Sequence, residues 1–304
     1  MTITRAMLPV LLEPKISTIW FEAYPEYPVE YTSFVNVKDT QKATITDFKM
    51  TDFGALRFKG EGENVIYDDV LPGQTKAVSP VRFALGYKIT DEMMKHDLYG
   101  IVTRFENALM RSAVNHQEVT AHLLLNNGFG TTSADGFDAI GFDGLALFST
   151  AHTRLDGGAV LRNRPSTDID ISVTGIQNML IDFDRLKNDR GRPQLIRPKT
   201  IIVNPEDKFT AQEILQSEYK PGTANNDVNA LRDKGLSFQV SHYLTDSDAW
   251  YVVGDSHDLN FVWDIRPQSA MMDDFDSMVT KRRVVQGYIG YHGEWRGTWA
   301  SSGG

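Results

Sequence analysis

One long helical pattern in the middle of the chain limits the folds that it can adopt. Thr90 can cap a helix, and Asp91 and Glu92 suit the positive end of its dipole. Gly128 ends the pattern as a left-handed cap would, and Gly100 is its one weak point. The spacing predicts a helix of about 35 residues, roughly 50 Å long. The residues that define it recur at three- and four-residue steps: Met94, Leu98, Ile101, Val102, Phe105, Leu109, Ala113, His116, Val119 and Leu123.

So long a helix has few places in a chain of 304 residues. It can belong to a coiled coil, to a helical repeat, or to an α+β domain that it crosses as a strut. The sequence shows neither strict heptads nor a repeat of fixed period. We therefore expect the strut, in an α+β fold.

A β-rich segment precedes the helix, from Phe48 to Ile89. Leu56–Lys59 and Val65–Tyr67 read as strands on either side of a turn at Gly60–Asn64, and Val81–Tyr87 alternates again. These strands have little apolar content left over for a core. An isolated hairpin of this kind is marginal in water, so we expect it to lie on another surface.

The first 42 residues are unusual for a domain core. Prolines defeat a long helix or a central strand, and they stand at Pro9, Pro14, Pro25 and Pro28. Aromatic side chains are dense here: Trp20, Phe21, Tyr24, Tyr27, Tyr31 and Phe34. Two interpretations stay open. The segment either packs on its own domain, or forms an arm that lays its aromatics on a neighbouring subunit.

The chain after the helix reads as α+β. Asp135–Asn163 looks like loops, Val173–Lys187 has helical spacing, and Asn188–Pro193 is a turn. Thr200–Val203 is a buried-strand run, and Asn204–Pro205 starts another helix. Short strand patterns follow at Leu236–Val240, Trp250–Val253, Leu259–Trp263, Val284–Ile289 and Glu294–Trp299.

Composition excludes several classes of function. Without cysteine there are no disulfides, thiolate metal sites or cysteine nucleophiles. The net charge of −9 argues against gripping nucleic acid, although it permits a protein to enclose it. No apolar run approaches the roughly 20 residues of a membrane span, and the N-terminus has no signal-peptide pattern. We expect a protein made and folded in a cytoplasm, without membrane contact.

The histidines do not converge on a reaction. His116 and His122 lie six residues apart on the predicted helix, so they point to different faces. Glu118 and His122 share a face, but one carboxylate and one imidazole do not make a metal site. We expect an ordinary helix pair, and neither a metal nor a cofactor.

Two serines come close to a hydrolase pattern. Ser149 with His152 would place nucleophile and base on one short loop without rigid support. Gly254-Asp255-Ser256 also opens the nucleophile block of one esterase family, but a turn between strands explains these residues equally well. A serine hydrolase using Ser149 or Ser256 stays the enzyme alternative to a non-catalytic protein.

The order of these parts resembles the major capsid proteins of tailed bacteriophages with the Hong Kong 97-type fold, including the Mu-like head-subunit group. The most specific local match is Asp143–His152, followed by Gly157, Gly158 and Asn163. Thr200–Pro205 before a helix and the aromatic, basic tail Lys281–Trp299 are also similar to the family.

The resemblance implies a division of the whole chain into five parts. The expected parts are an N-terminal arm at 1–45, an extended β-hairpin loop at 46–88, the spine helix of a peripheral domain at 89–135, an axial domain at 136–270, and C-terminal strands that return to the peripheral domain at 271–304. The extended loop is expected to lie over a neighbouring subunit.

The resemblance also implies a structural function. Copies of the chain would form pentamers and hexamers of an icosahedral head around double-stranded DNA, in a virion assembled in a bacterial cytoplasm. Expected partners are a portal protein, a separate scaffolding protein and decoration proteins. An encapsulin-type compartment, which shares the fold, is the close alternative.

Contacts between subunits would then be the functional residues. We expect them at Trp20, Phe21, Tyr24, Tyr27, Arg57, Lys59, Glu61, Glu63, Arg282 and Arg283. Some capsid subunits crosslink through a lysine of the extended loop. Lys59 and Lys76 lie on that segment, but no motif shows a partner for either, so we predict no crosslink.

Overall fold

The computed structural model describes residues 29–70, 72–96, 101–219, 228–274 and 276–304. Along the chain its elements are η3 (Tyr31–Ser33), β1 (Asn36–Asp39), β2 (Ile45–Met50), β3 (Pro72–Val78), β4 (Val81–Thr90), α2 (Asp91–Lys95), α3 (Ile101–Asn126), β5 (Phe137–Asp138), α4 (Val173–Asp184), β6 (Pro198–Val203), η4 (Pro205–Asp207), α5 (Lys208–Gln216), η5 (Arg232–Lys234), β7 (Ser237–Val240), β8 (Trp250–Gly254), β9 (Leu259–Asp274), β10 (Val279–His292) and β11 (Thr298–Ser301).

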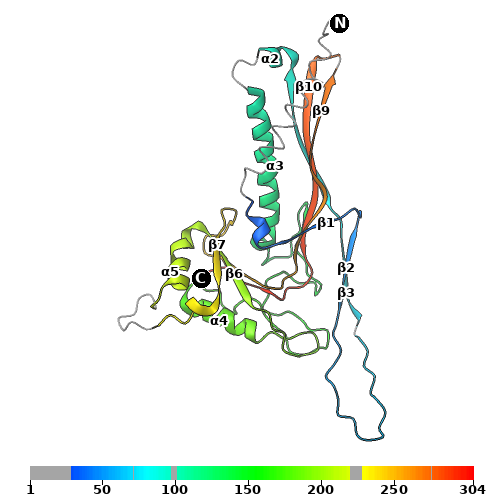
Figure 1. Ribbon diagram of the computed structural model, residues 1–304, viewed down its shortest axis with the longest axis vertical. Coiled ribbons are helices and arrows are strands. Elements are labelled where there is room, and N and C mark those ends of the chain that lie inside the picture. Colours follow the sequence, from blue (N-terminus) through cyan, green and yellow to red (C-terminus); the bar gives the residue numbers. More distant parts are fainter. Residues whose placement is uncertain (1–28, 71, 97–100, 220–227, 275) are drawn as a thin grey trace.

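The strands form three sheets. The five-stranded sheet has the order β1-β9-β10-β4, with β5 also paired to β10. The four-stranded sheet has the order β11-β8-β6-β7, and β2 pairs with β3 alone. Figure 1 shows three parts that follow from this: an elongated part of α3 beside β4, β9 and β10, a compact body around α4, α5 and β6, and a projecting hairpin. We call the hairpin, residues 45–78, the extended loop.

Helix α3 is held along the long strands by one apolar face. Leu109, Met110 and Ala113 pack against Val284 of β10, because steps of three and four residues keep them on one side of the helix. Further along, α3 enters the main core, where Ala121, Leu124 and Leu125 are buried. The helix therefore joins the elongated part to the body.

The main core lies in the body. The tilted rings of Trp250 and Trp299 pack with 4.7 Å between their centroids, from adjacent strands β8 and β11. Ile201, Ile202 and Val203 of β6 are fully buried beside them. The sequence predictions of β6, of a helix at 173–187 and of a helix after Asn204 are confirmed, the last beginning with a 3-10 turn.

The single helix of about 35 residues predicted from Thr90 onward is wrong. Thr90 does cap a helix, since its side chain accepts the N–H of Met93, but α2 ends at Lys95. The N–H of His96 closes that turn on the carbonyl of Glu92. Helix α3 has 26 residues, about 39 Å of axis. Gly100, the expected weak point, lies outside the described residues.

Two strands predicted within the extended loop are also absent. Residues 51–70 form neither strand nor helix, including the expected strands Leu56–Lys59 and Val65–Tyr67. The expected turn is present, with the N–H of Glu63 donated to the carbonyl of Gly60 at 3.2 Å and Gly62 at φ 80°. Alternating side chains stabilise a strand only when one face is buried, and these residues are exposed within the subunit.

Backbone pairing divides the chain differently from the expected ranges. β4, expected inside the loop at 46–88, pairs along its length with β10. Residues 259–270, expected in the axial domain, belong to β9 and pair with β10 too. β11, expected to return to the peripheral domain, pairs with β8 in the body. β9 and β10 form one long antiparallel pair, so a boundary at 270 cuts a single sheet.

Candidate functional site

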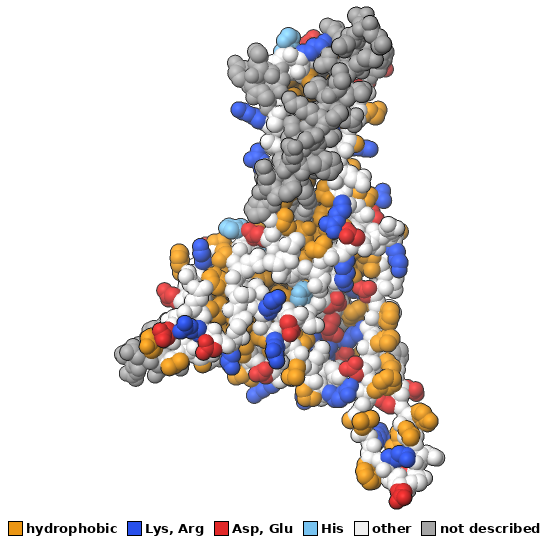
Figure 2. All heavy atoms as spheres, viewed as in Figure 1, with side chains coloured by type: hydrophobic (Ala, Val, Ile, Leu, Met, Phe, Trp, Pro, Cys, Tyr) orange, Lys and Arg blue, Asp and Glu red, His pale blue; other side chains and the backbone are white. Residues whose placement is uncertain are grey.

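The extended loop exposes an unusual amount of apolar surface. Eight of its apolar side chains are at least 59% exposed: Phe48, Met50, Phe53, Leu56, Phe58, Val65, Ile66 and Tyr67. Figure 2 shows hydrophobic side chains scattered along this projecting segment. So many large apolar side chains exposed on one projecting segment make it a candidate interaction site.

Strand β2 turns its polar face toward its own subunit. Asp47 and Lys49 are partly buried, whereas Phe48 and Met50 between them are exposed. A strand that belonged only to this subunit would place its apolar residues inward. Because the period of two separates the two sets, Phe48 and Met50 point outward, whereas Ile45 at the start of the strand still points inward.

The charged residues predicted for the tip of the loop lie where expected. Arg57, Lys59, Glu61 and Glu63 are all exposed on either side of the turn. Glu63 also accepts the N–H of Gly60 with its side chain at 3.0 Å, which ties the turn together. These charges are accessible to another molecule, and whether one binds them stays a prediction.

The predicted contacts of the arm lie mostly outside the described residues. Trp20, Phe21, Tyr24 and Tyr27 belong to residues 1–28. Where the description begins, Glu118 of α3 accepts two backbone N–H groups, from Glu30 at 2.8 Å and from Tyr31 at 3.2 Å. Tyr31 and Phe34 are buried. Residues 30–34 thus pack on their own subunit, which favours that interpretation for this part.

Glu118 is fully buried, and its environment is electrostatically unusual. Burial raises the pKa of Glu118 to about 7, although the two backbone N–H groups whose hydrogen bonds it accepts act to lower the pKa. His122 beside it hydrogen-bonds the carbonyl of Glu118 through Nδ1 at 2.7 Å and Ser241 through Nε2 at 2.8 Å. Burial lowers the pKa of His122. The pair is a buried helix contact, as expected, and joins α3 to residue 241 of the body.

Arg282 is not a surface residue, and its prediction as a contact between subunits is wrong. Its side chain is 2% exposed and lies 3.0 Å from the carboxylate of Glu106 on α3, which also accepts a hydrogen bond from Tyr87. Arg282 shares its strand face with Val284, which is buried against the same helix. Arg283 points the other way and is exposed.

The segment from Asp143 to Asn163, which carried the family resemblance, forms one buried polar network. His152 Nδ1 lies 2.6 Å from Asp143 Oδ2, and its Nε2 lies 3.0 Å from Asn163 Oδ1. The ring stacks on Trp295 at 4.2 Å with an interplanar angle of 6°. Both ring nitrogens therefore face polar partners from the same segment of the chain.

Asp143 and Asn163 complete this network. Burial is the largest single influence and raises the pKa of Asp143, but the interactions with His152, the N–H of Leu145 and Lys49 together outweigh it, so the pKa lies below its usual value. Asn163 accepts the N–H of Ser149 at 2.9 Å and donates to the carbonyl of Leu147 at 2.7 Å. These hydrogen bonds therefore tie the two ends of the segment between residues 143 and 163 together.

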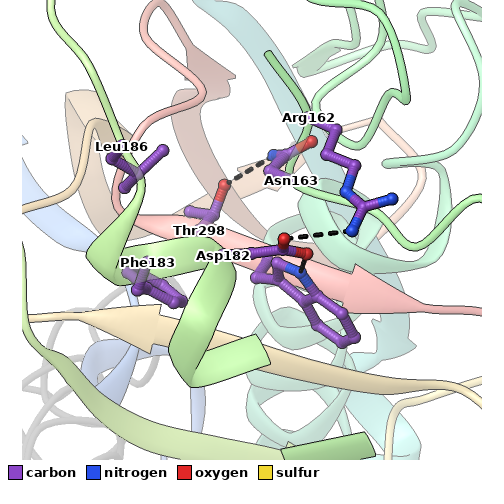
Figure 3. Close-up of a pocket in the computed structure, with 7 residues that line it drawn as sticks. Arg162, Asn163, Asp182, Phe183, Leu186 and Thr298 are labelled. Carbon is purple, nitrogen blue, oxygen red and sulfur yellow. Dashed lines mark hydrogen bonds and ion pairs between the residues drawn. The ribbon is translucent and has the colours of Figure 1, made fainter. Parts of the chain in front are cut away.

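The crevice beside Asn163 is too tight to admit a water molecule (Figure 3). Asn163 reaches Thr298 on one side, and Asp182 of α4 binds Arg162 at 3.1 Å and Trp299 at 3.2 Å on the other. Figure 3 shows these side chains pointing toward one another across the crevice. It is a packed junction between α4 and β11, without space for a substrate.

Neither serine of the hydrolase alternative is set up for catalysis. Both nitrogens of His152 are engaged by Asp143 and Asn163, and Ser149 Oγ accepts the N–H of Ala151 at 3.2 Å. Ser256 is exposed in the connection from β8 to β9, where Asp255 accepts the N–H of Arg197 at 3.1 Å. The interpretation of Gly254-Asp255-Ser256 as a turn is confirmed.

The hollows of the described residues are small. A polar hollow of about 290 Å³ lies at the base of the extended loop beside Lys49, and one of about 210 Å³ lies between α3, β4 and β10. Among these residues no group of three or more acidic or histidine side chains is arranged to hold a metal ion. No helix in the described part is long and apolar enough to cross a bilayer.

Sequence reasoning missed the polar side chains that hold the extended loop and the arm. Lys49 pairs with Asp189 at 2.9 Å and with Glu294 at 2.5 Å, and Glu118 holds residues 30 and 31. For Lys49 a signal existed, since Asp47-Phe48-Lys49-Met50 alternates polar with apolar residues. The pattern did not reveal which face would be buried.

Comparisons with known proteins agree on one family. A family model described as phage capsid protein matches residues 73–301. No curated protein matches the chain. Among solved structures, the decorated capsid of bacteriophage JBD30 matches with a TM-score of 0.55 and 16% identity, over 72% of this chain and 92% of that one.

Two further capsids cover more of the chain. The capsid of a native GTA particle has a TM-score of 0.57 at 8% identity, over 90% of each chain. That of Microbacterium phage Oxtober96 has a TM-score of 0.56 at 9% identity, over 91% of this chain and 92% of that one. These likenesses show the fold, and the finer resemblance to Mu-like head subunits stays a prediction. The chain therefore belongs to the phage capsid proteins: it is a non-catalytic structural subunit of a virion, with the α+β Hong Kong 97-type fold.

Proposed function

We propose that this capsid subunit assembles with copies of itself into pentamers and hexamers of a closed icosahedral head, with its extended loop on a neighbouring subunit. One observation carries the proposal. The loop turns Phe48, Met50 and the apolar side chains of residues 53–67 away from its own subunit. No part of the subunit that the structure describes buries them.

The energetics favour such a contact. Burying one large apolar side chain contributes about 1.5–3 kcal/mol, whereas association costs roughly 4–15 kcal/mol in lost freedom. Several of the loop's eight exposed apolar side chains, buried together, offset that cost. Each subunit of a closed shell also makes the contact more than once, so modest interfaces add up.

Charged and aromatic residues would surround this apolar contact. We assign Arg57, Lys59, Glu61 and Glu63 to the polar rim of the interface, because they are exposed at the tip of the loop. Arg283 on the outer face of β10 is a further contact. The arm aromatics Trp20, Phe21, Tyr24 and Tyr27 complete the proposed set.

The head would enclose double-stranded DNA without reading its sequence. A net charge of −9 leaves no excess of cations to grip phosphates. A portal, a separate scaffolding protein and decoration proteins are the proposed partners, and the JBD30 capsid is decorated with minor capsid protein trimers. No lysine crosslink is proposed, since Lys76 is engaged within its own subunit.

Apolar residues of the loop test the proposal. We expect Phe58→Ser combined with Tyr67→Ser to keep the subunit folded but to lose sedimenting particles, because the interface loses two large side chains. The matched control is Phe58→Leu with Tyr67→Phe, which keeps the positions apolar and should assemble. Normal shells from the double serine variant would contradict the role given to the loop.

A further inference from the structure

The apolar contacts of the extended loop with its own subunit are confined to one end. Ile45 and Val78 pack on a small cluster with Val262, Ile289 and Tyr291. Phe48 is already exposed, and β2 pairs only with β3. These apolar contacts therefore attach the loop, but do not fix the direction in which it leaves the subunit.

Lys49, near the end of β2, makes a second attachment. Its ammonium group lies 2.9 Å from Asp189 and 2.5 Å from Glu294, and its side chain is 15% exposed. Arg296 binds the same two carboxylates at 3.2 Å and 2.8 Å. Two cations and two carboxylates thus balance one another at the edge of the body.

Lys76 of β3 makes a third attachment on the other strand. Its Nζ donates to the backbone carbonyls of His292, at 2.8 Å, and Ile140, and lies 3.3 Å from Asp138. It also lies 5.6 Å from the ring centroid of Tyr291. The side chain is 9% exposed, so water competes little for these acceptors.

A cross-strand pair strengthens this attachment. Asp47 is the register partner of Lys76 across the hairpin, and it accepts a hydrogen bond from the hydroxyl of Tyr291 at 2.5 Å. Both strands are therefore tied to the last residues of β10. The lysine on β2 is tied elsewhere, to the turn after α4 and to the segment between β10 and β11.

We propose that Lys49 and Lys76 are positioning residues that set the direction of the extended loop in the free subunit, before it meets a neighbour. The inference rests on the proposed function, since a set direction matters only if the loop binds another copy. Charged hydrogen bonds of buried lysines are directional, and each lysine meets acceptors from a separate part of the chain. The apolar contact and the two lysines hold the base of the hairpin in one direction, and the turn at 188–192 adds contacts to Asp52, Asp68 and Asp69.

The absence of cysteine allows a direct test. Lys59→Cys at the loop tip and Gln177→Cys on the exposed face of α4 take spin labels in the full-length free subunit. We expect one narrow distribution of distances between the two labels when Lys49 and Lys76 are unchanged. Lys49→Met and Lys76→Met should lose the narrow peak, whereas Lys88→Met, at an exposed lysine of β4, should keep it.

A second variant separates loop direction from simple destabilisation. Lys49→Met with Glu294→Gln removes the partly buried carboxylate that Lys49→Met leaves unbalanced, and should restore the thermal midpoint of unfolding while the distribution stays broad. A narrow peak in Lys49→Met, or its return in the double variant, would overturn the inference. The proposed function fails independently, if unlabelled subunits with a narrow distribution never form shells.

Discussion

Several polar and charged side chains of this capsid subunit are buried, and specific partners hold each of them. His152 binds Asp143 and Asn163, Arg282 pairs with Glu106, and Glu118 accepts the start of the described chain. Removing one partner of a buried pair leaves an uncompensated charge, which is costly. These residues therefore control the stability of the subunit.

His152→Phe tests the network in the family-like segment. Phenylalanine keeps a ring beside Trp295 but leaves the carboxylate of Asp143 without its partner, so we expect a loss of about 3 kcal/mol or more in the free energy of unfolding. Chemical denaturation of the subunit measures this. His96→Phe, at an exposed histidine, should change stability by less than about 0.5 kcal/mol. Equal effects of the two changes would refute the network's role.

Glu118→Gln tests the buried carboxylate through pH. The folded-state pKa of about 7 lies above the ordinary 4.5. Between these values the folded chain holds more protons than the unfolded chain, so Glu118 makes stability fall as pH rises through this window, by up to about 3 kcal/mol. This fall in stability with rising pH should disappear in Glu118→Gln and persist in Glu61→Gln, at an exposed glutamate. An unchanged slope in Glu118→Gln would contradict the assignment.

At the scale of elements, the local sequence pattern correctly predicted the helices and strands that are specified by the spacing of their own residues. The four-residue steps of α3 and the run Thr200–Val203 have one stable arrangement whatever surrounds them. The loop strands at 56–59 and 65–67 failed, because their apolar face has no partner within one subunit. The prediction that Arg282 is a surface contact was wrong for the opposite reason. The alternation of strand residues from Val284 indicated that Arg282 is buried, but the basic run around it suggested that it is exposed.

The close approach of β2 and β3 can be tested at Gly73. A Cβ atom there would lie 1.5 Å from the carbonyl oxygen of Lys49, so Gly73→Ala must push the strands apart. We expect a cost of about 1–3 kcal/mol and faster amide exchange in β2. Gly130→Ala, where an added Cβ would lie 3.8 Å from the carbonyl oxygen of Asn127, should leave exchange in β2 unchanged. Protected β2 amides in Gly73→Ala would refute this.

The whole molecule combines a part with its own packed core and a projecting loop whose apolar side chains are exposed. The body and the elongated part share the main core and the long strands, whereas the extended loop projects from them with its apolar side chains exposed (Figures 1 and 2). Such a division suits a subunit that folds first and buries its remaining surface on assembly. The sequence indicated the loop's part of this division through a hairpin with little apolar content for a core, whereas the aromatics Trp20, Phe21, Tyr24 and Tyr27 of the arm lie outside the described residues.

Particle formation by the purified, unmodified chain tests the assembly function most directly. Electron microscopy and sedimentation should show closed shells of uniform diameter, and residues 51–70 should exchange amide hydrogens quickly in the free subunit and slowly in the shell. A chain that stayed monomeric at every concentration, salt and pH, with those residues already protected from exchange, would contradict it.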